Sequence, residues 1–215
     1  MSAKISQTRK YDSSRRQAQA RQTRLQIAEA ARALFLERGY GGTSIEAIAD
    51  KAGVAPETIY ASFKNKRNVL SFVFDIAIGG DDEDIRLLDR PDPQAVLQET
   101  DQQRQLTMFA HDITKILHRA APVFEILRIA AKTEPEIAEL VQRLLQERLA
   151  NMNMVAKAVA ANGHLRENLN RTRAAEVIWS MTSPELYLLL TRELRWTDEQ
   201  YAQWLADALI RLVLP

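Results

Sequence analysis

The sequence predicts an all-α protein of about nine helices. Glycine and proline are scarce, at seven residues each in a chain of 215, while the abundant Ala, Leu, Glu, Gln and Arg favour helix. Alternating β-branched segments are nearly absent, and apolar residues recur at the spacing of amphipathic helices. The expected architecture is a small helical headpiece followed by a larger helical bundle, and the length allows two domains.

Four helices are expected in the first 80 residues. Gly39 is expected to end the first helix, and the capping-box pair Thr43 and Glu46 to begin the second. Pro56 stands at the first position of the third helix, and Asn65 is expected to cap the fourth. The expected ranges are 16–38, 43–51, 56–63 and 65–80.

Five more helices are expected after a connecting loop that is rich in aspartate. Two further capping boxes, Thr133 with Glu136 and Thr197 with Gln200, mark helix starts. Pro184 predicts either a kink or a break, and the sequence leaves the two alternatives open. The expected ranges are 92–119, 122–132, 133–161, 170–195 and 197–214.

The positive charge of the chain is concentrated at its N-terminal end. The formal net charge is only +1, yet residues 1–70 carry 13 basic and 6 acidic groups, whereas acidic groups are in excess over residues 71–215. Such asymmetry hints at a polyanion-binding end. Residues 1–15 read as a basic, flexible tail, and the sequence leaves open whether this tail is merely solvated or is an arm that contacts DNA.

Composition excludes several classes of function. The chain has no cysteine, which excludes disulfides and thiolate sites and favours a cytoplasmic location. Its apolar runs are too short to span a membrane. The sequence contains no recognisable set of catalytic residues and no metal-binding motif, and no cofactor is expected. His111 and His118 lie about two helical turns apart, too far to share a metal ion.

The segment from Ile45 to Phe63 has the pattern of a helix-turn-helix motif. Gly53 supplies the backbone conformation that a sharp turn between helices requires, and small and apolar residues form a shared core. The second helix leaves short or aromatic-polar side chains exposed, which suit a DNA groove. Ala55, at the N-cap of this helix, cannot cap with its side chain, so the first backbone amides remain available to a DNA phosphate.

Four motifs lie between residues 22 and 70: LF…RGY at the end of the first helix, GGTS before the second, IA..AGVA.ETIY in the helix-turn-helix and F.NK..VL at the entry to the fourth. With these motifs the segment closely resembles the DNA-binding domain of the TetR family of bacterial transcription regulators. The resemblance implies a homodimer that binds palindromic double-stranded DNA, usually as a repressor released by a small-molecule effector. The expected domains are then a tail (1–15), a DNA-binding domain (16–66) and an effector-binding and dimerisation domain (67–215).

The resemblance also implies which positions meet DNA. Phosphate contacts are expected from Thr43, Thr58, Tyr60 and Lys66, and base contacts from Pro56, Glu57, Ala61 and Ser62. Because Ala61 and Ser62 are smaller than the residues frequent at these positions, base reading is expected to depend on contacts with thymine methyl groups.

The C-terminal helices predict a dimer interface and, less specifically, an effector pocket. Their apolar surface is wider than one-sided burial requires, so we expect a two-fold four-helix bundle. The expected interface residues are Leu186, Leu189, Leu190, Trp204, Leu205, Ala208, Leu209 and Leu212. Candidate pocket residues, for which an ordinary core or surface role is the alternative, are Met108, His111, Met152, Trp179 and Met181.

Two functional hypotheses remain from the sequence. The first is a dimeric DNA-binding regulator in which the helix over residues 66–79 transmits effector binding to the headpiece. The second is an all-helical protein-interaction adaptor that uses its basic tail only for solubility. Specific, salt-dependent binding to a duplex separates the two.

Overall fold

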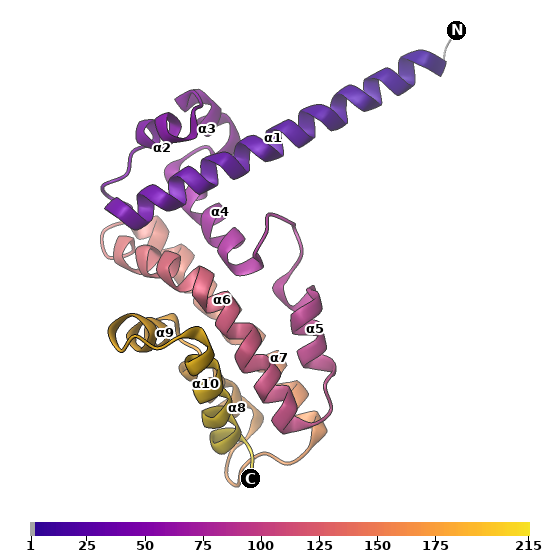
Figure 1. Cartoon of the computed structure of the whole chain (residues 1–215), viewed down its shortest axis with the longest axis vertical. Coiled ribbons are helices and arrows are strands. Elements are labelled where there is room, and N and C mark those ends of the chain that lie inside the picture. Colours follow the sequence, from indigo (N-terminus) through magenta and orange to yellow (C-terminus); the bar gives the residue numbers. More distant parts are fainter. Residues whose placement is uncertain (1–2) are drawn as a thin grey trace. The chain divides into compact units, whose positions relative to one another are not determined.

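A computed structural model describes residues 3–215, with side chains from residue 15 onward, and every regular element in that range is helical (Figure 1). The all-α prediction is confirmed. The chain divides into two compact units, Met1–Val73 and Phe74–Pro215. Their boundary lies inside α4 (Lys66–Gly79), a few residues beyond the predicted one.

The first unit begins with a helix that is longer than predicted. Helix α1 spans Ala3–Arg38 and therefore starts well before Arg16, so the segment predicted as a tail continues the helix. The reason is local: the segment contains neither glycine nor proline before Gly39 and is rich in good helix formers. Gly39 ends α1 in a left-handed conformation with φ 70°.

The loop between α1 and α2 (Ile45–Ala52) corrects a predicted cap. Ser44, not Thr43, is the N-cap of α2, and its Oγ accepts a hydrogen bond from the Ala47 amide at 3.1 Å. Thr43 is 1% exposed, and its hydroxyl donates to the carbonyls of Gly39 (2.8 Å) and Leu34 (3.2 Å). The capping box failed because the neighbouring serine fills the same role while the threonine joins the core.

Helices α2 and α3 (Pro56–Phe63) form the expected helix-turn-helix. Gly53 ends α2 with φ 66°, and the Val54 amide donates to the Ala49 carbonyl at 3.0 Å. Ile27 of α1, Ile48 of α2 and Ile59 of α3 are fully buried. The core residues of three helices therefore meet, which fixes the direction of α3.

The second unit is built around one long helix. Helix α6 (Gln102–Ala130) packs against α5 (Pro91–Gln98), α7 (Pro135–Asn162), α9 (Pro184–Leu188) and α10 (Asp198–Val213), and α8 (Arg171–Met181) packs against α7 and α10. None of the helices within residues 3–215 combines the length and the apolar character that a membrane crossing requires.

Several helix boundaries in this unit differ from the predicted ones. Pro122 was expected to begin a helix but lies inside α6, where the surrounding core sustains the helix across it. The break comes earlier, where Asp101 caps α6 by accepting from the Arg104 amide at 2.8 Å. Glu134 rather than Thr133 precedes α7, because Pro135 fixes the first helical position.

The last two helical segments resolve the alternative left open at Pro184. The chain breaks there, and Ser183 caps α9 by accepting from the Leu186 amide at 3.1 Å. A π-helical turn, Leu189–Glu193, follows directly. The capping box of Thr197 and Gln200 is confirmed at the start of α10, where both reciprocal hydrogen bonds form.

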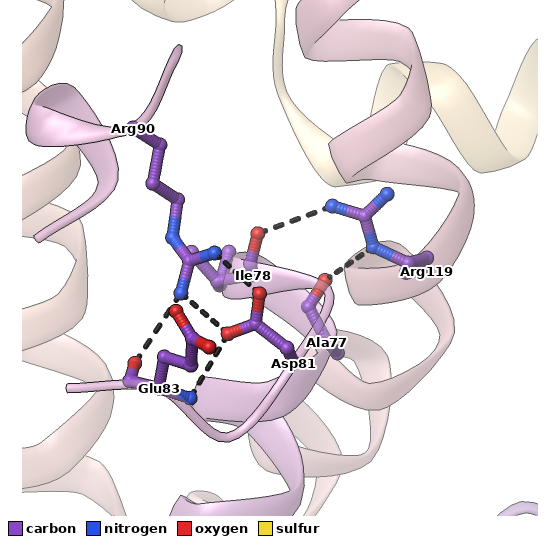
Figure 2. A network of polar contacts seen from close by, with 6 residues as sticks. All are labelled: Ala77, Ile78, Asp81, Glu83, Arg90 and Arg119. Atoms are coloured by element: carbon purple, nitrogen blue, oxygen red, sulfur yellow. Dashed lines mark hydrogen bonds and ion pairs between the residues drawn. The ribbon is translucent and has the colours of Figure 1, made fainter. Parts of the chain in front are cut away.

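Two arginines hold the C-terminal end of α4 within the second unit (Figure 2). Arg119 of α6 donates to the carbonyls of Ala77 (3.0 Å) and Ile78 (3.2 Å), which have no partner within the helix where α4 ends. Arg90 makes a two-pronged contact with the Asp81 carboxylate at 2.7 and 2.8 Å. The end of α4 is thereby tied to α6 and to the start of α5.

Replacing Arg119 with glutamine is expected to lower the free energy of unfolding by about 2 kcal/mol, because hydrogen bonds from a charged donor to two carbonyls are removed. Urea unfolding measures the change. The control is Arg128→Gln, which removes an exposed ion pair with Glu185 (3.6 Å) and should change stability by less than about 1 kcal/mol. Equal effects of the two substitutions would contradict a special role for Arg119.

Candidate nucleic-acid interface

Helix α3 presents a polar and small-residue face to solvent. Glu57, Tyr60 and Ala61 are exposed, with Tyr60 at 49%, while Ile59 and Phe63 on the opposite side are buried in the headpiece core. Pro56, Thr58 and Ser62 are half-buried at the edges of this face. Six of the positions predicted to meet DNA therefore lie on or beside one accessible surface.

The beginning of α3 has the open cap that the sequence predicts. Ala55 is the N-cap, is exposed and makes no side-chain hydrogen bond to the helix. Pro56 occupies the first helical position and has no amide hydrogen of its own. A helix that starts in this way can accept an anion at its N-terminus without displacing a side-chain cap.

The N-terminal end of α4 is held by its own side chains. Asn65 accepts from the Asn68 amide at 2.9 Å, and the Asn68 side chain donates to the Phe63 carbonyl at 2.8 Å. The Lys66 ammonium donates to the carbonyls of Tyr40 and Thr43, both at 2.9 Å, and lies 4.1 Å from the centre of the Tyr40 ring. These contacts join α4 to the α1–α2 loop.

One of the residues predicted to contact phosphates is corrected by this arrangement, and a second has contacts of its own within the protein. Thr43 is buried, and its hydroxyl is directed to protein carbonyls, so its side chain is not presented to DNA. Lys66 is half-buried and donates its ammonium to two carbonyls of the loop, and its phosphate contact stays a prediction. The exposed N-cap Ser44, which sequence reasoning missed, is the candidate at the start of α2; its place beside Thr43 in the capping pattern was the available signal.

Arg24 is a second residue that sequence reasoning missed. Its guanidinium lies 4.6 Å from the ring centres of both Phe63 and Phe72, and it donates to the Ser62 carbonyl at 3.2 Å. An arginine between two aromatic rings gains cation–π attraction. Arg24 thus braces the C-terminal end of α3 against α1 and α4.

Two of the predicted pocket residues, Met152 and Trp179, lie around a half-buried arginine. Arg148 of α7 donates to the carbonyl of Trp179 and to the hydroxyl of Thr182 (3.1 Å), and it lies 4.8 Å from the centre of the Trp179 ring. Met152 is 4% exposed, with its sulfur 3.8 Å from the Thr182 hydroxyl. Met181 immediately precedes Thr182. Burial lowers the pKa of Arg148 to about 10, so the guanidinium remains charged at neutral pH.

The other pocket residues are less closely connected to this cluster. The Met181 carbonyl accepts from the Tyr201 hydroxyl at 3.2 Å. Met108 and His111 are half-buried on α6, where His111 lies 4.0 Å from the Glu199 carboxylate. His118 pairs instead with Asp198 at 2.8 Å. No group of residues within the described part of the chain has the composition and spacing of a metal site.

The predicted dimer residues separate into two faces. Leu205 and Leu209 are fully buried on α10, which packs against α6, and Leu190 is 8% exposed, so these three belong to the core of one subunit and their assignment to an interface is wrong. Leu189 and Leu212 are 53% and 40% exposed. The remaining candidates are half-buried: Leu186, Trp204 and Ala208.

Comparison with known proteins agrees with the geometry of the headpiece. Residues 27–71 match the family model described as bacterial regulatory proteins, tetR family. The chain is 29% identical over 174 residues to the HTH-type transcriptional repressor BepR of Brucella suis, covering 78% of this chain and 80% of that protein.

Solved structures share the fold over nearly the whole chain. The transcriptional regulator FadR of Bacillus subtilis, in complex with stearoyl-CoA, has a TM-score of 0.69 at 21% identity and covers 86% of this chain and 97% of its own. NalD of Pseudomonas aeruginosa, the secondary repressor of the MexAB-OprM multidrug efflux pump, has a TM-score of 0.65 at 20% identity and covers 90% and 97%. The headpiece therefore matches the DNA-binding domain of the TetR family, and the chain as a whole has the fold of the transcriptional regulators named above.

Proposed function

We propose that the protein is a dimeric repressor that binds an inverted-repeat operator and is released by a small molecule bound in the second unit. The observation that carries the proposal is the accessible face of α3, which stands in a basic headpiece and is fixed by its buried opposite side. A helix held in this way can enter the major groove.

Different parts of α3 are suited to different contacts. The exposed Tyr60 hydroxyl and the half-buried Thr58 hydroxyl are proposed to donate to phosphates, together with the amides after Ala55. Pro56 and Ala61 offer apolar surface to thymine methyl groups, and the small side chain of Ser62 can meet a base edge. Glu57 can accept a hydrogen bond from a cytosine amino group.

Dimerisation is proposed through the outward faces of the C-terminal helices. Leu189 and Leu212 are exposed, and Trp204 and Ala208 are half-buried on α10, whose inner face forms part of the core. A two-fold interface would use the same patch on both subunits. It would also set two recognition helices about 34 Å apart, the spacing of successive major grooves.

Effector binding is proposed near the Arg148 cluster. Arg148, Met152 and Trp179 combine a cation, an adaptable thioether and an aromatic ring, a set that suits an amphipathic organic ligand. The stearoyl-CoA complex of the B. subtilis regulator supports a ligand of this general kind in the same fold. Because α4 is tied to α6 by Arg119, a ligand that shifts α6 would shift α4.

The proposed function is tested first by selecting bound duplexes from a random pool. An inverted repeat whose half-sites lie about one helical turn apart is the expected result. Recovery of no preferred sequence would refute the proposal and leave the adaptor hypothesis.

On the selected operator, Tyr60→Phe should weaken binding about ten-fold or more, because one charge-assisted hydrogen bond per subunit is removed. The reduction should be similar for operators that differ at single base pairs, since phosphate contacts carry no sequence information. Ala61→Gly provides the comparison, because removal of its methyl group should alter the preference at one base position only. A Tyr60→Phe effect confined to one position would argue against a phosphate contact.

Replacing the exposed Leu212 with aspartate should raise the dimer dissociation constant roughly 100-fold, because a charge would be buried at the interface. Sedimentation velocity measures the change, and operator affinity should fall with it. The matched control is Ile129→Asp, which alters a 61% exposed apolar residue at the end of α6. If the Leu212 variant remains a dimer, the proposed interface is wrong.

The release mechanism requires that the effector lowers the affinity for operator by the same factor by which the operator lowers the affinity for effector. Stearoyl-CoA is the first probe, and a rise in melting temperature on its addition would identify it as a ligand. Its dissociation constant, measured by calorimetry, should then increase in the presence of saturating operator. Identical ligand affinity with and without operator would exclude the coupling.

A further inference from the structure

We infer that the N-terminal extension of α1, residues 3–22, is a second DNA-binding element that lies along the duplex beside the half-site. This inference rests on the proposed function, because it assigns an additional contact to the same protein–DNA complex. It chooses between the two readings of the basic tail that the sequence leaves open.

The part of the extension whose side chains are described, residues 15–22, stands outside the apolar core of its unit. All eight residues from Arg15 to Gln22 are exposed, whereas burial begins only after this stretch, with Ile27 and Ala28 inside the core. In Figure 1 the helix continues well past the part of α1 that lies beside α2 and α3. A polar helix without a buried apolar face gains little stability from its own chain.

The charge of the extension identifies the partner as a polyanion. Residues 1–24 carry seven basic groups and one acidic group, Asp12, and the next acidic residue is Glu29. Arg15, Arg16 and Arg21 have exposed side chains. Because the helix has no apolar stripe, it lacks the feature by which amphipathic helices bind membranes. In the proposed function the polyanion bound by this unit is DNA, so we assign the extension to the same DNA.

The length of the extension matches a defined stretch of flanking duplex. About 20 helical residues at 1.5 Å per residue extend about 30 Å, equivalent to about nine base pairs at 3.4 Å. Contacts with phosphates over this distance would add affinity without adding sequence preference. The extension would thus lengthen the bound DNA while α3 alone reads the half-site.

The test compares two triple variants in which the same number of positive charges is removed. Arg15, Arg16 and Arg21 are changed to glutamine, which preserves helix propensity; the control changes the exposed Lys132, Lys157 and Arg171 of the second unit to glutamine. Operator affinity is measured from 50 to 300 mM salt. The variant of the extension, called the arm variant below, should bind roughly ten-fold more weakly at low salt. In a plot of the logarithm of the binding constant against the logarithm of the salt concentration, the magnitude of its slope should fall by about 0.9 for each phosphate that the extension no longer neutralises.

A second measurement locates the contact. Wild-type protein should bind an operator with about ten flanking base pairs on each side more tightly than the bare inverted repeat, and the arm variant should show no such difference. Equal affinities and salt slopes for the arm and control variants would overturn the inference while leaving the proposed function intact. If the wild-type protein itself ignores every duplex, the proposed function fails instead, so the two failures are distinguishable.

Discussion

The burial of one stripe of α1 against α2, α3 and the start of α4 is the constraint on which the DNA-binding surface depends. Ile27, Ala31 and Phe35 are almost fully buried, as are Ile48 and Ile59 on the helices they meet. Eight-residue helices such as α2 and α3 are too short to be stable in water by themselves. Their packing against each other and against α1 keeps the exposed side of α3 in a single orientation.

Polar side chains complete this arrangement at the points where the apolar core ends. Arg24 covers Phe63 and Phe72 and bonds to α3, while Lys66 bonds to the loop before α2. Both residues are cations in a headpiece that binds a polyanion, yet their heads are directed to protein groups. The net charge of a surface therefore overstates the number of cations that can reach DNA.

The sequence was sufficient to predict the helical class, the helix-turn-helix and the exposed residues of α3, because these depend on local spacing and on glycine and proline. It was insufficient where two local signals competed. Thr43 and Ser44 could each cap α2, and burial decided between them. Pro122 was overridden by the core that encloses α6, whereas Pro184, with a serine before it to cap the next helix, did break the chain.

The same limit applies to the second unit. Apolar composition indicated that α10 buries more than one face, but it could not assign Leu205 and Leu209 to the interior and Leu212 to the exterior. That division depends on how α10 rotates about its axis when it meets α6, which is a long-range packing property. The Arg148 and Arg119 contacts were equally invisible, since each joins residues that are at least 30 positions apart.

The continuity of α4 across the boundary between the two units has a mechanical consequence. A helix of 14 residues is about 21 Å long, and it is bonded to the α1–α2 loop at one end and to α6 at the other. Acting as a lever, it would turn a tilt of about 10° at the end bonded to α6 into a displacement of about 3.7 Å at the other end. A displacement of that size exceeds the length of a hydrogen bond, so in the proposed release mechanism a small rearrangement within the second unit would be enough to break the contacts of α3 with DNA.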